Sequence, residues 1–225
     1  ISRAFRPGVA KQAFRTSLLS HYGLKTLLYG TLLPGPDIGR GCADIMRGVR
    51  DAGHEVGVHG WDHAQWLTDA DAAGIAWTER QMRQACNQFS NVFQTAPATH
   101  GAAGWQMNRH ALRMTQRLGF SYASDCRGTH PFMPVWNAEV VQCPQIPTTL
   151  PALDELIGTG TITADNVDGH LLDRTRKRPD SSRFAGHVFT LRAEHEGMKL
   201  APAFDRLLSG WKQQGYELVG MQKIR

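Results

Sequence analysis

The stretch HEVGVHGWDHAQW, residues 54–66, combines a strand pattern with a pair of histidines. Val56 and Val58 alternate with polar or small residues, which predicts a strand over 54–59. Directly upstream, apolar residues recur at helical spacing and a glycine follows them, which predicts a helix over 41–52 that ends at Gly53. The two elements together predict one helix–strand unit of an α/β fold.

The same alternation continues along the chain. Further helices are predicted over 69–90, 165–177 and 200–211. One more is predicted to begin after Asn108 as its N-cap and to bury Ala111, Leu112, Thr115 and Leu118. Further strands are predicted over 97–100, 120–125, 140–146, 187–191 and 216–221, with a polar loop over 176–183. Strands that alternate with helices predict βα units around a parallel sheet or barrel.

Composition predicts one globular domain over residues 1–225. Hydrophobic residues make up 41% and charged residues 20% of the chain, which is close to the globular average. No apolar run is long enough to span a bilayer. The four cysteines form no CxxC pair, which argues against a zinc knuckle and a disulfide framework and favours a reducing, cytosolic compartment.

Positive charge is concentrated at the start of the chain. Residues 1–36 hold five Lys or Arg and no acid, and the whole chain has a net charge of +5, so residues 37–225 sum to zero. One interpretation is contact with an anionic surface, such as membrane headgroups or phosphate. The other is a solvated helix that packs through its leucines, and both can hold. We do not expect nucleic acid as a partner, because the rest of the chain has no basic stripe.

His59 and His63 are candidate metal ligands. Spacing of i, i+4 places two imidazoles on one side of a turn or helix. The motif H-x3-H is short, however, and the chain has ten histidines, so an accidental pair is the alternative. A hydrolytic metal normally takes three protein ligands, which means that a third must come from elsewhere.

Other polar groups also follow predicted strands. In parallel α/β folds, functional side chains gather at the carboxyl ends of the strands. The residues in such positions are His59, Gly104, Trp105, Asp125, Arg192, Glu194, His195 and Glu196.

Several longer stretches carry a resemblance to a known family. They are YGTLLPGPDIG (29–39), EVGVHGWDHAQW (55–66), AAGW (102–105), SDCRGTHPF (124–132), PQIPTTLPALDELIG (144–158) and RAEHEG (192–197). Through them the chain resembles the polysaccharide deacetylase family, and most closely its branch of 4-deoxy-4-formamido-L-arabinose-phosphoundecaprenol deformylases. The resemblance covers nearly all 225 residues and implies a distorted (β/α) barrel.

The resemblance implies a role for each matched residue. His59 and His63 would be the two metal-binding histidines, and Asp125 an orienting group near the site. Gly104 and Trp105 would line the sugar pocket, where a backbone N–H can face an oxyanion. Alternatives stay open for two of them: core packing for Trp105 and a structural cap for Asp125.

Arg127 would contact the substrate phosphate, because a guanidinium grips phosphate in bidentate fashion. A surface ion pair is the alternative for this arginine.

Two departures from the family pattern bear on activity. The family's opening strand carries an Asp-x-Asp element that supplies the base and the third metal ligand, and no matching element occurs here. We therefore expect at least one βα unit ahead of residue 1, and a barrel that is incomplete at its N-terminus. Arg192 stands where the branch usually has a histidine that acts as general acid. Arginine does not release its proton near neutral pH, so His195 is the candidate acid and Arg192 a substrate-binding cation.

The resemblance implies a metal-dependent hydrolase that removes a formyl group from a lipid-linked aminosugar phosphate, in the modification of lipid A with aminoarabinose. The metal would be divalent, with zinc, cobalt, manganese and iron all compatible. We expect peripheral attachment to the cytoplasmic face of the bacterial inner membrane, and the sequence does not indicate an oligomeric state. Alternatives are another carbohydrate N-deacetylase of the family, or a truncated member that binds without catalysis.

Overall fold

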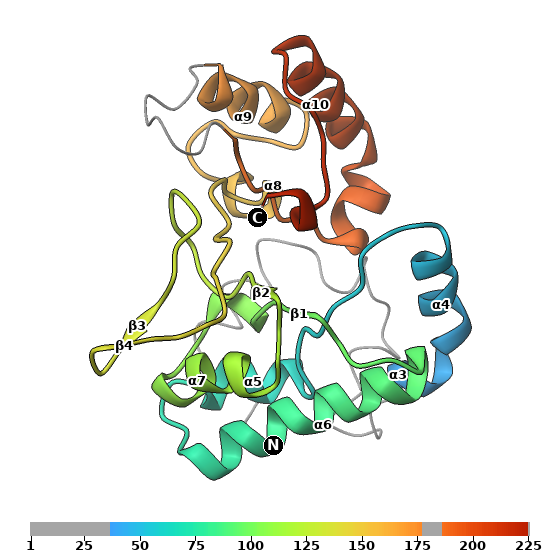
Figure 1. The fold of residues 1–225 in the computed structure, drawn as a ribbon. Coiled ribbons are helices and arrows are strands. Elements are labelled where there is room, and N and C mark those ends of the chain that lie inside the picture. The colour runs from blue at the N-terminus through green and yellow to red at the C-terminus, as the bar shows by residue number, and fades with distance from the viewer. Residues whose placement is uncertain (1–36, 177–185, 225) are drawn as a thin grey trace, which may run out of the picture. The chain divides into compact units, whose positions relative to one another are not determined.

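A computed structural model describes residues 37–176 and 186–224 (Figure 1). The chain divides into two compact units, Ile1–Ala43 and Asp44–Arg225. The expected single domain with a basic segment over 1–36 stays a prediction, since that segment and most of the predicted 176–183 loop lie outside the described residues. No helix in the described ranges has the length and apolar content needed to cross a membrane.

The elements follow one another in a mixed α/β order. The helices are α3 (Ile38–Gly41), α4 (Ala43–Asp51), α5 (His63–Asp69), α6 (Ile75–Phe93), α7 (Arg109–Arg117), α8 (Leu153–Leu156), α9 (Val167–Thr175) and α10 (Ala201–Gln213). The strands are β1 (Thr99–His100), β2 (Tyr122–Ala123), β3 (Val135–Trp136) and β4 (Glu139–Val140). Short helical turns are η1 (Ala103–Trp105), η2 (His195–Lys199) and η3 (Met221–Lys223).

The parallel arrangement predicted from the sequence is present, with short ladders. β1 pairs in parallel with β2, while β3 and β4 form a separate antiparallel hairpin. Single parallel bridges extend the first sheet on both sides, from Val58 to His100 and from Ala123 to Gln145. The order of segments is thus 58, β1, β2, 145, which is that of successive βα units.

Three predicted strands are wrong as strands. Residues 54–59 form one bridge in the described residues, at Val58, and the chain turns directly after this segment, where Gly60 has a φ of +140°. Residues 187–191 and 216–221 form no regular ladder with any described residues. The predicted strand 140–146 keeps β4 at its start and isolated bridges at Gln145.

The predicted helices are confirmed with shifted bounds. The 69–90 helix begins later, at Ile75, because Gly74 is its extended N-cap, and a shorter helix, α5, precedes it. The Asn108 cap is confirmed: its side-chain oxygen accepts from two backbone N–H groups, each at 2.9 Å. α7 buries Met114 as well as Ala111 and Thr115, whereas Leu112 and Leu118 are half-buried.

Two apolar clusters hold the fold together. One joins α5, α6 and α7 to β2 and Val141, with Trp66, Met82, Met114 and Phe120 among its buried residues. The other joins α8, α9 and α10, with Leu153, Leu171, Leu207 and Trp211 among its buried residues. α9 and α10 lie side by side (Figure 1).

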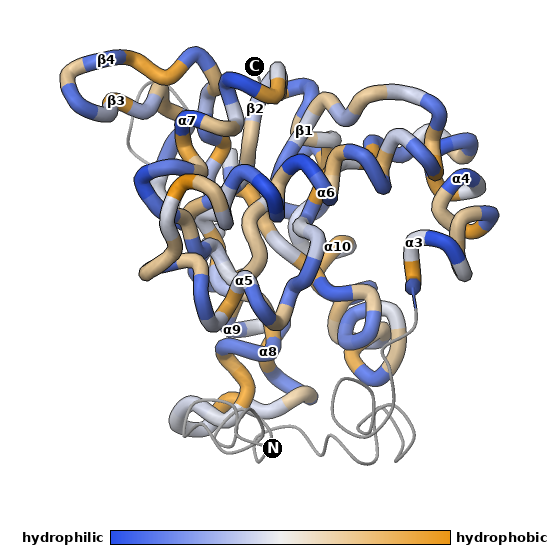
Figure 2. The backbone as a smooth tube through the Cα atoms, turned by 90° about the horizontal axis from the view of Figure 1, so that it is seen from below, coloured by the Kyte–Doolittle hydropathy of each residue, from blue (hydrophilic) through white to orange (hydrophobic). Residues whose placement is uncertain are grey.

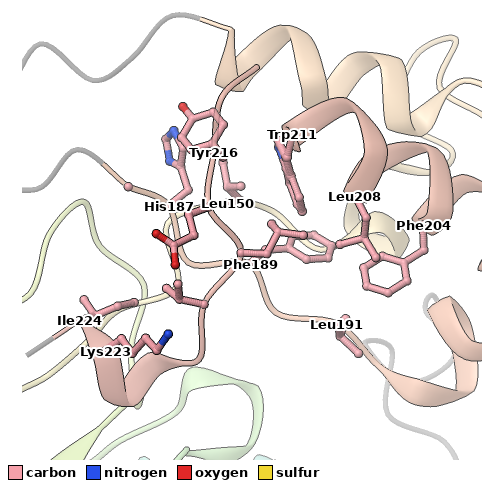
Figure 3. A pocket seen from close by; sticks show the side chains of 14 residues that line it. Leu150, His187, Phe189, Leu191, Phe204, Leu208, Trp211, Tyr216, Lys223 and Ile224 are labelled. Atoms are coloured by element: carbon pink, nitrogen blue, oxygen red, sulfur yellow. The ribbon is translucent and has the colours of Figure 1, made fainter. Parts of the chain in front are cut away.

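A cavity of about 560 Å³ opens beside the second cluster (Figure 3). Its lining is mostly apolar and includes Leu150, Phe189, Phe204, Leu208, Trp211 and Tyr216. None of the site residues predicted from the sequence lines it. The chemistry predicted for this chain therefore has to be sought elsewhere.

Candidate functional site

His59 and His63 lie together, as predicted. His59 directly follows the bridge at Val58, and its Nδ1 lies 2.8 Å from the carbonyl oxygen of Gly101. His63 is the first residue of α5, whose N-cap Asp62 accepts from Gln65 N at 2.9 Å. The two imidazole centroids are 5.3 Å apart. One histidine is thus placed by the sheet and the other by a capped helix.

The surroundings of His63 favour a neutral imidazole. Burial lowers the pKa of His63, and electrostatic interactions with His59 and Arg192 lower it further, while Asp62 and Glu194 oppose them. A histidine must be neutral to act as a metal ligand, so this shift suits that role. Arg192 and Glu194, from the RAEHEG turn, thus lie within electrostatic range of His63. The sequence named Glu194 only by its place after a predicted strand, and its interaction with His63, more than 100 residues away, could not be predicted.

The AAGW turn lies next to the strand end of β1. Gly104 has a φ of +61°, which favours glycine, and a Cβ there would come within 2.4 Å of Leu67 Cδ2, so the leucine side chain would have to move. Trp105 is half-buried and also has a positive φ, of 56°. Its indole Nε1 donates to Thr148 Oγ1 at 3.0 Å, and that hydroxyl lies 2.7 Å from Thr190 Oγ1. These side-chain hydrogen bonds therefore hold Trp105 in a backbone conformation that is otherwise unfavourable.

Arg127 covers the ring of Trp105. Its guanidinium carbon lies 3.9 Å from the ring centroid, well within cation–π range. Its Nη2 donates to both carboxylate oxygens of Glu155 at 2.6 Å, and Nη1 donates to Leu150 O at 3.3 Å. The ion pair considered as an alternative is present, and phosphate contact by this arginine stays a prediction.

Asp125 is fully buried at the centre of a hydrogen-bond network. Its Oδ1 lies 2.6 Å from His100 Nδ1 and accepts from Ala102 N at 2.9 Å, while its Oδ2 accepts from Gln145 Nε2 at 3.0 Å. Gln145 Oε1 in turn accepts from the Asp125 backbone N–H at 3.0 Å. Ala102 follows Gly101, whose carbonyl holds His59, so Asp125 fixes the backbone that orients a candidate ligand. His100 and Gln145 were missed, although both lie in stretches with a strand pattern.

Arg192 is tied to a carboxylate on α8. Its guanidinium pairs with Asp154, and its backbone N–H donates to Glu196 Oε2 at 2.8 Å. Glu196 is buried, and this burial raises its pKa. His195 begins η2, and its backbone N–H donates to Arg192 O at 2.9 Å. A general-acid role for His195 stays a prediction.

The positions of His59 and His63 are compatible with two ligands of one metal ion. His59 Nδ1 faces a carbonyl oxygen, which fixes this nitrogen as the donor and turns the lone pair of Nε2 outward. Within the described ranges, however, no group of three or more His, Cys, Asp or Glu side chains is placed to hold an ion.

Comparison with known proteins identifies relatives along the whole chain. A probable 4-deoxy-4-formamido-L-arabinose-phosphoundecaprenol deformylase of Shewanella sediminis is 35% identical over 224 residues, covering 100% of this chain and 70% of that protein. A second protein of that name, from Wigglesworthia glossinidia brevipalpis, is 29% identical over 208 residues, covering 92% of this chain and 70% of that protein. No family model matches the chain.

Solved structures share the fold at low identity. A protein of Mycobacterium smegmatis assigned to the polysaccharide deacetylases aligns with a TM-score of 0.62 at 19% identity, covering 99% of this chain and 82% of that one. Puue allantoinase aligns with a TM-score of 0.65 at 18% identity, covering 83% and 62%. A family 4 acetyl xylan esterase from Clostridium thermocellum, solved with a cobalt ion, aligns at 0.50 and 12%, covering 82% and 70%. The fold is therefore the distorted (β/α) barrel of the polysaccharide deacetylases, and the chain belongs to the 4-deoxy-4-formamido-L-arabinose-phosphoundecaprenol deformylase family.

Proposed function

We propose that the chain forms the catalytic domain of a hydrolase that removes the formyl group from 4-deoxy-4-formamido-L-arabinose carried on undecaprenyl phosphate. Water adds across the amide C–N bond, releasing formate and a free amine on the sugar. The 35% identity to the Shewanella protein supports the substrate. The observation that carries the proposal is the pairing of His59 with His63, with His59 oriented by Gly101 O.

His59 and His63 would hold a divalent metal. When bound, such an ion polarises a carbonyl and lowers the pKa of water towards about 7. Imidazole suits zinc, cobalt, manganese and iron alike, and the cobalt in one solved neighbour belongs to that protein. The lowered pKa of His63 keeps a neutral ligand available in mildly acidic solution.

The surrounding residues would position the sugar. The N–H groups of Ala102 and Trp105 are occupied by Asp125 and Ala102 O, so Ala103 and Gly104 are the candidate donors to the oxyanion. Asp125 acts as a positioning residue, because it contacts the turn and not the histidine pair. Trp105, with Arg127 stacked on its ring, would line the sugar pocket.

Two cations and one histidine complete the proposed site. Arg127 would bind the phosphate, and Arg192, beside His63, would stabilise negative charge. His195 is the proposed general acid for the leaving amine. An arginine in place of the family's histidine makes this assignment the one that most needs testing.

The test compares His59→Ala with a matched control, His170→Ala, which replaces an exposed histidine on α9. We expect His59→Ala to weaken zinc binding, measured by calorimetry, by at least about tenfold and to abolish formate release from the lipid-linked substrate. His170→Ala should change neither. Unchanged formate release in His59→Ala would show that the metal assignment is wrong.

Assays of the same protein also test two alternative functions. A general carbohydrate N-deacetylase would release acetate from an N-acetyl analogue at least as fast as formate from the N-formyl substrate. A member that binds without catalysis would bind the lipid-linked sugar and release neither acid. The name of the relatives favours the deformylase.

The proposed place of action is the cytoplasmic face of the inner membrane, with peripheral attachment. The product, an aminoarabinose on undecaprenyl phosphate, would donate a cationic sugar to lipid A. A substrate held in the bilayer by its polyprenyl chain must be met at the membrane surface, and the basic segment 1–36 suits an anionic surface. Recovery of the protein with membranes at low salt, and its release at high salt, would test this location.

A further inference from the structure

The β3–β4 hairpin presents apolar side chains to solvent. Phe132 is 41% exposed, Met133 42%, Val135 62% and Val140 46%. Val135 and Val140 are directly opposite each other in the antiparallel register, so their side chains share one face. We call these four residues the hairpin tip. Exposed apolar residues are ordinary one at a time, whereas four within nine residues of one hairpin mark an interaction surface.

The base of the hairpin is fixed to the core. Val141 is fully buried, and Trp136 packs against the cluster formed by α5, α6 and α7. Arg113 of α7 donates to Trp136 O at 3.2 Å and pairs with Glu139. Because Trp136 and Glu139 face away from Val135 and Val140, these contacts hold the hairpin without covering its tip.

Positive charge lies on α7, the helix that holds the base of the hairpin. α7 carries Arg109, Arg113 and Arg117, with no acidic residue, and residues 80–124 contain no Asp or Glu at all. Arg109 and Arg117 are exposed. Figure 2 shows hydrophobic stretches on the hairpin and hydrophilic ones along α7. An apolar tip with arginines on the helix at its base matches the two layers of an anionic bilayer surface, acyl chains and headgroups.

A second exposed apolar face, on α4, lacks this match. Ile45 and Val49 are exposed there, but the neighbouring arginines are neutralised within the helix. Arg47 pairs with Asp44, and Arg50 pairs with Asp51. Arg113 of α7 is likewise paired, with Glu139, but Arg109 and Arg117 form no ion pair within the described part of the chain. These two arginines distinguish the hairpin from α4.

We propose that the hairpin tip inserts into the interface of an anionic lipid bilayer, with Arg109 and Arg117 of α7 on the headgroups. The proposal rests on the proposed function, in which the substrate is anchored in that bilayer. The hairpin begins a few residues after Arg127, and Phe132 bridges to Gln145, the partner of Asp125. A hairpin seated in the membrane thus places the candidate site close to the lipid phosphates.

The test measures binding of the whole chain to vesicles by flotation. The vesicles are phosphatidylethanolamine with about one third phosphatidylglycerol, compared with pure phosphatidylcholine. The variant Met133→Ser/Val135→Ser should bind the anionic vesicles at least about tenfold more weakly than wild type. Ile45→Ser/Val49→Ser on α4 is the matched control and should bind like wild type. All chains keep residues 1–36, so differences among them report the substituted sites.

A second variant tests the charges. Arg109→Gln/Arg117→Gln should lose roughly fivefold in affinity per arginine on anionic vesicles and nothing on phosphatidylcholine. Unchanged binding of Met133→Ser/Val135→Ser, or equal loss in the α4 control, would overturn the proposal. Loss of a dimer in that hairpin variant with unchanged vesicle binding would instead assign the tip to self-association, and also overturn it.

Formate release from substrate in detergent micelles separates this proposal from the proposed function. Hairpin-dependent vesicle binding without formate release contradicts the hydrolase and supports the membrane contact. Formate release with vesicle binding that does not depend on the hairpin supports the hydrolase and contradicts the membrane contact of the hairpin.

Discussion

Replacing Asp125 by Asn tests whether this carboxylate acts through the hydrogen-bond network around it. The substitution preserves shape but turns one acceptor oxygen into a donor. If the Asn oxygen keeps the bonds to His100 and Ala102, its amide nitrogen faces Gln145 Nε2, and two donors then oppose each other. Gln145 cannot relieve this by rotating its amide, because its oxygen accepts from the residue 125 backbone N–H at 3.0 Å.

The expected loss follows from the number of contacts affected. One unsatisfied pair of buried donors costs about 1–3 kcal/mol, and loss of the charge on the acceptor weakens the remaining bonds by about 1 kcal/mol. We therefore expect Asp125→Asn to lower the free energy of unfolding by about 2–4 kcal/mol. For a chain of this size that corresponds to a melting temperature lower by roughly 5–15 °C. The exposed Asp173→Asn on α9 is the control and should change stability by less than about 0.5 kcal/mol.

The double variant Asp125→Asn/Gln145→Glu sharpens the test. The carboxylate introduced at position 145 would accept from the amide introduced at position 125 and from the backbone N–H of residue 125. Every bond of the network is then restored, and only the bond between the two side chains changes direction. Urea unfolding should show the double variant to be more stable than Asp125→Asn by about 1–2 kcal/mol. Equal stability of the two variants would refute the network argument. Restored stability without formate release would show that the charge at position 125 also serves the reaction.

Three further predictions concern titration and charge. Burial and the neighbouring Asp125 raise the pKa of Cys126 to about 11, so iodoacetamide should label it at pH 8 roughly 100-fold more slowly in the folded chain than in urea. A labelling rate equal to that in urea would contradict this. The hydrogen bond from Arg206 lowers the pKa of Asp168 in the folded chain. This ion pair therefore stabilises the fold above the unfolded pKa of Asp, about 4, and the stabilisation is lost as the pH falls from there through the lowered folded pKa. Between pH 7 and pH 3, the urea midpoint of wild type should therefore fall further than that of Asp168→Asn. Glu155→Gln should free Arg127 and tighten binding of inorganic phosphate by roughly two- to fivefold, measured by calorimetry.

Local features of the fold could be predicted from the sequence because they depend on neighbours in the chain. Asn108 caps α7 as predicted, since the bonds involved span two or three residues. The His59 and His63 pair could be found for the same reason, from a spacing of four. The strand predicted at 54–59 was wrong in regularity, because its one bridge, from Val58 to His100, depends on a partner 42 residues away that local alternation does not identify.

Long-range partners could not be predicted from the sequence. The bonds of Asp125 join residues 20 to 25 positions away, and periodicity says nothing about which strands are adjacent. The same limit applies to Arg192, whose ion pair with Asp154 spans 38 residues. Resemblance could name Asp125 and Arg192 as site residues, but it could not say which groups hold them.

α8 holds the two arginines of the proposed site, Arg127 and Arg192, with different strength. Its first turn carries Asp154 and Glu155, and these neighbouring acids hold Arg192 and Arg127 respectively. The Asp154 carboxylate is 13% exposed, so breaking its pair would strand a mostly buried charge, which is costly. Glu155 and Arg127 are 36% and 37% exposed, and such a pair contributes less than about 1 kcal/mol. In the proposed site, a substrate phosphate would recruit Arg127 by displacing Glu155, whereas Arg192 would stay paired with Asp154 as a permanent positive charge.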